Sequence, residues 1–164
     1  MEKGIFLYRG FVVNNLKEIA RKGFNIRNRD SVLGEINWPG GISFGRNDMF
    51  EFAQEVSRQK GGIPVCGRIK ISEDNLKDIN LTGIKRILDF SEGMTPGGID
   101  HWRCLDWNDL QKAWEFTLSP NDLKPDKILK LYGAFSIEPG IYKPFSEFKS
   151  GVEGKGFFER FLRR

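Results

Sequence analysis

Three polar residues of this chain carry the groups needed to hold an anion and to stabilise positive charge beside it. Arg9 follows the apolar run of residues 4–8, and its planar guanidinium suits phosphate or ribose oxygens. Ser43 lies between glycines in Gly-Ile-Ser-Phe-Gly, where its hydroxyl can position other groups. Glu115 is a carboxylate between two aromatic residues, a pattern that indicates a site or an exposed strand edge. A carboxylate near a bound anion could stabilise positive charge that develops in a transition state.

The local patterns predict which elements would position these residues. Residues 4–8 form a continuous apolar run typical of a buried strand, so Arg9 would lie at its end. Residues 40–72 predict a short strand containing Ser43, then a helix, a glycine turn and a second strand. Asp48 is the expected cap of that helix, and apolar positions alternate in the second strand. The serine would therefore precede a helix directly.

The remaining elements indicate an α+β fold. Residues 16–22 and 106–112 predict short helices, and residues 113–118 predict the strand that carries Glu115. Residues 84–90 predict a strand or a short helix, and residues 127–135 predict a further strand, whereas prolines make residues 136–150 look irregular. Because short strands outnumber helices, we expect a mainly antiparallel, split β-sheet with flanking helices.

This pattern resembles the arginine-serine-glutamate branch of the ADP-ribosyltransferase superfamily. The resemblance covers roughly residues 5 to 132 and rests on Leu7-Tyr8-Arg9-Gly10, the Ser43 region and Trp114-Glu115-Phe116, with Asn121-Asp122-Leu123 and Ile128-Leu129-Lys130-Leu131 downstream. It implies an ADP-ribosyltransferase-like fold that binds NAD as a substrate and cleaves the nicotinamide–ribose bond. Arg9, Ser43 and Glu115 would be the catalytic triad, with Glu115 bonded to the ribose 2′-hydroxyl and stabilising the cation.

The same resemblance suggests further NAD contacts. Gly10 would let a ligand approach the backbone, so that its amide and carbonyl bind the carboxamide. Arg46 precedes a predicted helix and could assist with a phosphate. Phe44 and Phe52 could stack on nicotinamide, although aromatic residues at such spacing also suit a hydrophobic core. With Arg9 and Ser43, these residues complete the expected cofactor-binding set.

The acceptor of ADP-ribose stays open at this point, as do the alternatives. Relatives that modify arginine carry an acidic or amide residue two positions before the glutamate, where this chain has Ala113. A protein, a nucleic acid or water could accept ADP-ribose, and an NAD-dependent RNA 2′-phosphotransferase or an NAD glycohydrolase would use the same fold. From another class, the chain could be a non-catalytic basic module that binds nucleic acid or protein.

A serine hydrolase is a further alternative. Gly-Ile-Ser-Phe-Gly has the G-x-S-x-G spacing of a nucleophile elbow, and such an elbow needs a histidine later in the chain. His101 is the one histidine, with Asp100 and Asp106 near it. This alternative requires His101 within reach of Ser43.

Composition bounds the class of protein. A length of 164 residues, 39% hydrophobic and 29% charged, predicts one soluble domain, expected over residues 1–150. A basic amphipathic tail is expected over residues 151–164, and its last ten residues, with four basic side chains and one acidic side chain, account for +3 of the net charge of +4. The two cysteines, Cys66 and Cys104, predict neither a disulfide scaffold nor a metal site. With no signal peptide or apolar span in view, we expect a cytoplasmic protein without a transmembrane segment.

Overall fold

The computed structural model describes residues 4–22, 42–86, 99–103, 106–118, 130 and 132–153. Its strands are β1 (Gly4–Val13), β2 (Ile42–Gly45), β3 (Ile63–Ser72), β4 (Leu81–Arg86), β5 (Ile99–Arg103), β6 (Glu115–Leu118), β7 (Gly133–Glu138) and β8 (Ile141–Pro144). Its helices are α1 (Leu16–Lys22), α2 (Phe50–Lys60), α3 (Glu73–Leu76), α4 (Trp107–Lys112) and α6 (Phe145–Glu153). The expected α+β class is confirmed.

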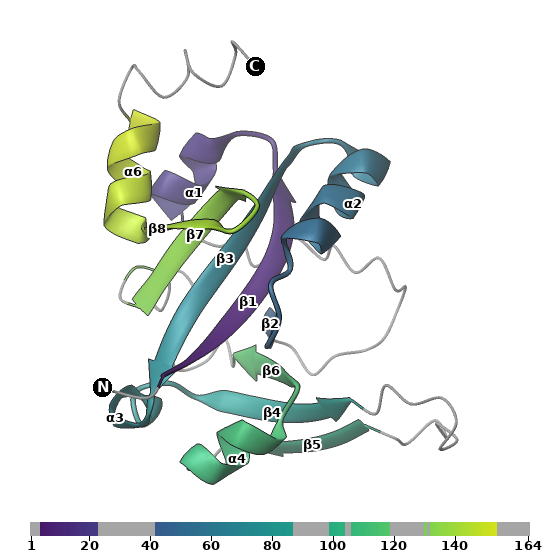
Figure 1. Ribbon diagram of the computed structural model, residues 1–164, viewed down its shortest axis with the longest axis vertical. Helices are drawn as coiled ribbons and strands as arrows, with labels where there is room; N and C mark the ends of the chain where they lie inside the picture. Colours follow the sequence, from purple (N-terminus) through teal and green to yellow (C-terminus); the bar gives the residue numbers. More distant parts are fainter. Residues whose placement is uncertain are drawn as a thin grey trace.

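The described strands form one antiparallel sheet in the order β5-β4-β6-β2-β1-β3-β7-β8. The pairing of β1 with β3 is continuous from Gly4↔Ser72 to Val13↔Ile63, so Arg9 lies within β1 and the prediction that it ends the strand is wrong. By contrast, β1 and β2 share only the pair Tyr8↔Gly45. The sheet bends at this weak junction, and Figure 1 shows β4 and β5 running nearly crosswise to β1 and β3. The split sheet therefore opens between β1 and β2, the strands that carry Arg9 and Ser43.

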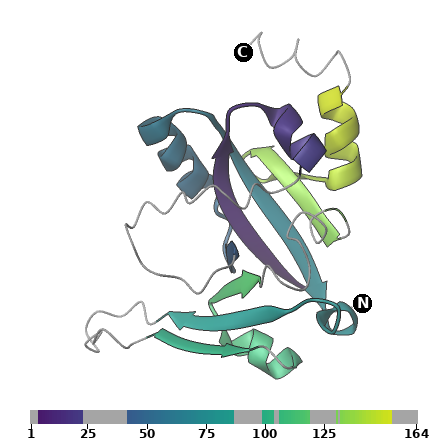
Figure 2. The same ribbon diagram turned by 180° about the vertical axis from the view of Figure 1, so that it is seen from behind.

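Each face of β1 and β3 has its own cover. Odd-numbered residues of β1, such as Leu7 and Phe11, point into the core together with Phe135 of β7. Helices α1 and α6 close this face, and Phe148 of α6 stacks 5.4 Å from Phe135. Helix α2 packs on the opposite face of the two strands, so the sheet lies between helices (Figures 1 and 2).

Several predicted elements are confirmed with small changes at their ends. Asn15 accepts a hydrogen bond from the Lys17 amide at 2.9 Å and so begins α1, and Asp106 caps α4 through the Asp109 amide, also at 2.9 Å. Helix α2 starts one residue later than predicted because Met49 is its N-cap, while Asp48 accepts from the Phe50 amide at 2.8 Å. Gly61, with φ of 78°, ends the helix as expected.

The prediction of irregular structure over residues 136–150 is wrong. Strand β7 continues to Glu138, a turn at Gly140 leads into β8, and α6 runs from Phe145 to Glu153. The predicted strand over residues 127–135 is confirmed for its last three residues and wrong at residues 130 and 132, which are helical, while its other residues lie outside the described ones. Since α6 runs from Phe145 to Glu153, the expected boundary between domain and tail at residue 150 falls inside a helix. The tail beyond Glu153 and the downstream motifs of residues 121–129 lie outside the described residues.

Candidate functional site

Arg9 and Ser43 meet where the sheet opens. The Arg9 guanidinium donates a hydrogen bond from Nη1 to the backbone carbonyl of Ser43 at 3.0 Å. This bond spans the stretch in which β1 and β2 no longer pair through their backbones. A side chain thus satisfies a strand carbonyl at the opening, and the Arg9 charge is fixed at that position.

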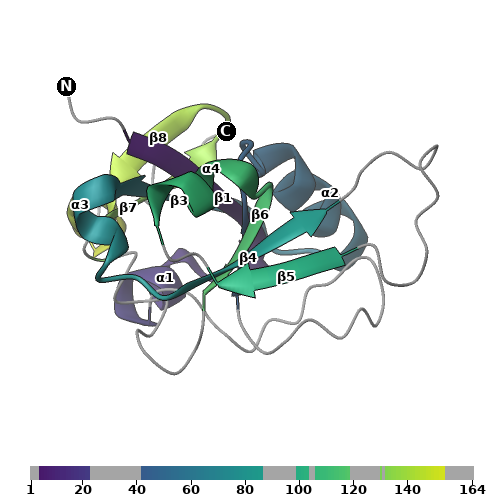
Figure 3. The same cartoon turned by 90° about the horizontal axis from the view of Figure 1, so that it is seen from below.

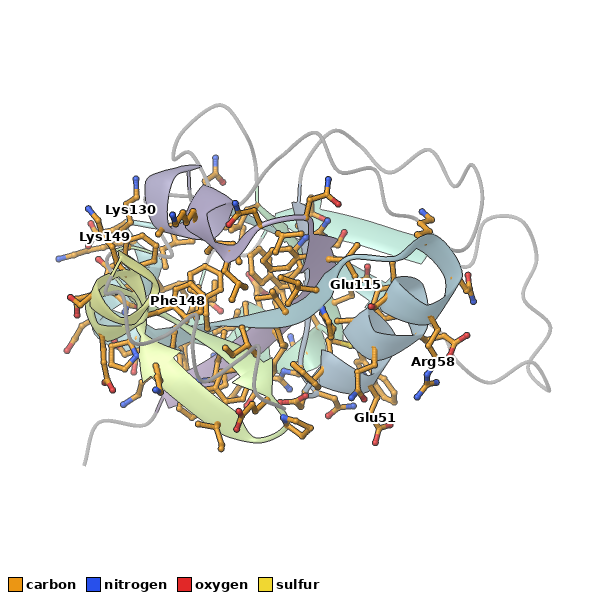
Figure 4. All side chains as sticks on the ribbon, turned by 90° about the horizontal axis from the view of Figure 1, so that it is seen from above. Glu51, Arg58, Glu115, Lys130, Phe148 and Lys149 are labelled. Atoms are coloured by element: carbon orange, nitrogen blue, oxygen red, sulfur yellow. The ribbon has the colours of Figure 1, made fainter. Side chains whose placement is uncertain are left out.

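Ser43 and Glu115 come from neighbouring strands and share one face of the sheet. Ser43 pairs with Thr117 of β6, and the Ser43 Oγ lies 3.4 Å from the Thr117 Oγ1. Glu115, two residues before Thr117, pairs with Gly45 and is half-buried. Ser43 and Glu115 are therefore diagonal neighbours, at a separation of about 7–8 Å for such pairs. Figure 4 shows Glu115 near the middle of the molecule, whereas Glu51 and Arg58 project outward from α2.

A row of paired positions extends from β3 through β1 and β2 to β6. Arg68 pairs with Tyr8, Tyr8 with Gly45, and Gly45 with Glu115, so all four positions lie on one face. A Cβ added at Gly45 would meet only the Met49 Sδ at 3.7 Å. Gly45 thus places no side chain between the positions of Tyr8 and Glu115 in this row.

Tyr8, Thr117 and Arg68 were not among the predicted site residues. Phe6, Tyr8 and Gly10 alternate with core residues along the strand, and this alternation predicts that the Tyr8 phenol lies on the face opposite Leu7. No local signal pointed to Thr117 or Arg68, because their relation to the site comes from strand order.

Gly10 has a packing role that differs from the predicted one. A Cβ at this position would lie 2.3 Å from the Met49 carbonyl oxygen and 3.2 Å from the Ala53 amide nitrogen. The first turn of α2 thus lies against Gly10, in the place where the resemblance puts the nicotinamide carboxamide. Gly10 is required here so that α2 can lie against β1.

Two of the predicted NAD contacts need correction. Phe44 is 1% exposed within the hydrophobic core, so its ring has no surface on which nicotinamide could stack. Arg46 donates to the carbonyls of Leu110 and Gln111, each at 3.3 Å, at the C-terminal end of α4. Its charge complements that helix end rather than a phosphate at the start of α2. Phe52 is half-buried on α2, and its contact with nicotinamide stays a prediction.

A hydrogen-bonded group lies beside Gly10 on the same face. The Tyr142 hydroxyl of β8 donates to the Asp48 carboxylate, which links β8 to the start of α2. Burial and the Asp48 carboxylate both raise the pKa of Tyr142. Cys66 of β3 is the strand partner of Gly10 in β1, and burial likewise raises the pKa of its thiol. A buried thiol that keeps its proton is a poor nucleophile, so Cys66 does not join the candidate site.

The serine hydrolase alternative finds no support in the strand order. His101 lies on β5 and pairs with Ile84 of β4, which pairs with Glu115 of β6. Strands β4 and β6 therefore separate its backbone from Ser43, a distance of about 14 Å at ~4.8 Å per strand. The serine–histidine hydrogen bond that such an enzyme needs is too short to cover that separation. Figure 3 shows β6 and β4 between β5 and the rest of the sheet.

Two further expectations concern metals and membranes. Within the described residues, no group of three histidine, cysteine, aspartate or glutamate side chains could hold a metal ion. None of the described helices is both long enough and apolar enough to cross a membrane.

Comparison of the chain with protein-family models, curated proteins and solved structures finds no match in any of the three.

Proposed function

We propose that this protein is an NAD-dependent ADP-ribosyltransferase that cleaves the nicotinamide–ribose bond. The observation that supports it most strongly is the position of Arg9, Ser43 and Glu115 on three adjacent strands, β1, β2 and β6. Arg9 donates to the Ser43 backbone carbonyl from an odd-numbered position of β1, the parity of Leu7 and Phe11, whereas the Ser43 and Glu115 side chains are diagonal neighbours on the other face. Residues that are 34 and 72 positions apart in the chain thus lie on neighbouring strands.

The chemistry requires charge placement more than covalent assistance. As the C–N bond breaks, its electron pair leaves with nicotinamide and the ribose carbon becomes cationic. The Glu115 carboxylate would stabilise this charge, Arg9 would hold the diphosphate, and the Ser43 hydroxyl would orient the ribose and the carboxylate. The acceptor then donates an electron pair to the ribose carbon and loses its proton. With water as acceptor, the same steps give an NAD glycohydrolase.

The test is nicotinamide release from NAD by the purified protein, compared with Glu115→Gln. This change removes one negative charge at nearly constant shape, so turnover should fall by a factor of about 10² to 10³. Glu147→Gln is the matched control, because Glu147 is exposed on α6, away from the β1–β2 opening. Its rate should equal that of the unchanged protein.

Binding of NAD, followed by calorimetry, separates the remaining outcomes. If the protein neither binds NAD nor releases nicotinamide from it, the proposal is overturned. Binding without release would indicate that a macromolecular acceptor must be supplied. Release that persists in Glu115→Gln at the wild-type rate would remove Glu115 from the reaction and with it the proposed triad.

A further inference from the structure

Aromatic and basic side chains occupy adjacent positions on the outer face of β1 and β3. Phe6 pairs with Lys70 and Tyr8 pairs with Arg68, so two rings on one strand lie opposite two cations on the next. All four residues lie on the face of the sheet opposite Leu7 and Phe11. We call these four residues the β1–β3 face.

Arg68 is held between two rings of this surface. Its guanidinium carbon lies 4.4 Å from the ring centre of Phe6 and 4.4 Å from that of Tyr142. Tyr142 in turn makes an edge contact with Tyr8, with ring centres 5.8 Å apart. Cation–π contacts fix the guanidinium without using its N–H groups. In the part of the chain that the structure describes, Arg68 makes no hydrogen bond or ion pair, so its donors remain for a ligand.

The β1–β3 face is also accessible and positively charged. Phe6 is 38% exposed, one of the few large apolar side chains at the surface of the described residues. Lys70 is exposed and makes no ion pair among the described residues. On this face β1 and β3 contribute the cations of Arg68 and Lys70 and no carboxylate, while Arg9 has the opposite parity on β1. An exposed ring beside cations that make no ion pair suits an anionic partner with flat groups.

We propose that the β1–β3 face binds single-stranded nucleic acid. Unpaired bases would stack on Phe6 and Tyr8, while Arg68 and Lys70 pair with the phosphates between them. A duplex hides its base faces and could use only the cations, so single strands should bind more tightly. An acidic peptide would pair with the cations but has no planar groups for both rings. This binding requires no NAD and does not depend on the proposed function.

The experiment is fluorescence anisotropy with a labelled oligothymidylate of about twelve nucleotides and with a duplex of the same length. Phe6→Leu keeps an apolar side chain but removes the π face, and should weaken single-strand binding about tenfold or more. Lys70→Gln removes one phosphate contact and should lower the salt dependence by about one unit of log Kd per log salt. Lys149→Gln, on α6 at the opposite face, is the control and should bind like the unchanged protein (Figure 4).

Circular dichroism of each variant distinguishes loss of binding from loss of folded structure. Lys70 is exposed, so Lys70→Gln should fold like the unchanged protein and report on binding alone. Weaker single-strand binding by folded Phe6→Leu and Lys70→Gln, with Lys149→Gln unchanged, would support the proposal. It would be overturned by absence of single-strand binding at about 50 mM salt. Equal affinity for the duplex, or wild-type binding by both variants of the β1–β3 face, would also overturn it.

Discussion

Replacement of Gly10 by alanine tests whether this glycine is required for helix packing or for contact with a ligand. The added Cβ would lie 2.3 Å from the Met49 carbonyl oxygen, so the first turn of α2 would have to retreat by about 1 Å. That carbonyl also accepts the first hydrogen bond of the helix, from Ala53 at 3.0 Å, and cannot rotate away cheaply. Helix α2 buries Phe50, Ala53 and Val56, and a shift would loosen all three.

The expected cost lies at the upper end of the range for overpacked cores, about 2–3 kcal/mol of unfolding free energy. For a chain of this length, that loss corresponds to a fall of roughly 4–12 °C in Tm. Urea unfolding followed by circular dichroism gives the free energy, and calorimetry gives the Tm.

Gly45→Ala is the matched control for Gly10→Ala. Its added Cβ would meet only the Met49 Sδ at 3.7 Å, an ordinary contact, so the unfolding free energy should change by less than about 0.5 kcal/mol. Equal stability of Gly10→Ala and the unchanged protein would refute the packing argument. If Gly10→Ala kept its stability but bound NAD more weakly, Gly10 would instead contact the ligand, as the sequence resemblance suggested.

Three other perturbations test the surroundings of the site. Arg46→Met should lower the unfolding free energy by about 1 kcal/mol, because two carbonyls of α4 lose their hydrogen-bond donor. The affinity for NAD should not change. Weaker NAD binding at unchanged stability would instead indicate that Arg46 contacts a phosphate of NAD. Burial raises the pKa of Cys66, so the protonated thiol stabilises the fold fully below its unfolded pKa and this contribution is lost as pH rises above about 9. Tm should therefore fall with alkaline pH less steeply in Cys66→Ala than in the unchanged protein, and parallel profiles would contradict this. Tyr142→Phe should cost about 1 kcal/mol in urea unfolding through the lost hydrogen bond to Asp48. A double-mutant cycle with Asp48→Asn checks the pair, since purely additive effects would show that it contributes nothing.

Local sequence patterns determined most of the elements that carry the candidate site. The apolar run before Arg9, the caps at Asn15 and Asp106 and the glycines at 61 and 62 each act within a few residues, so their effect can be predicted without the fold. The same reasoning failed for residues 136–150. There, Pro139 and Pro144 stand at a turn and at a strand end, where proline interrupts no central pairing, and α6 is stabilised by burying Phe145 and Phe148.

Sequence patterns alone also could not decide which predicted contacts face the site. Phe44 and Ser43 are adjacent in β2 and point to opposite faces, and only the packing of the core showed that the ring is buried. Arg46 follows the same strand, but its guanidinium turns to α4, whose position depends on the pairing of β6. The sequence around Gly10 is compatible with a ligand contact, but in the structure α2 occupies the space beside this glycine.

The sequence by itself determined an α+β fold and placed Ser43 and Glu115 in short strands, whereas Arg9, expected at a strand end, lies within β1. Tertiary structure decided that these strands are neighbours, because the partners in Arg9–Ser43 and Ser43–Thr117 are separated by 34 and 74 residues. Pairing over such distances is set by burial of whole faces, and each residue in a strand contributes only a fraction of that free energy. For the same reason, the β1–β3 face appeared only when the register placed Arg68 opposite Tyr8.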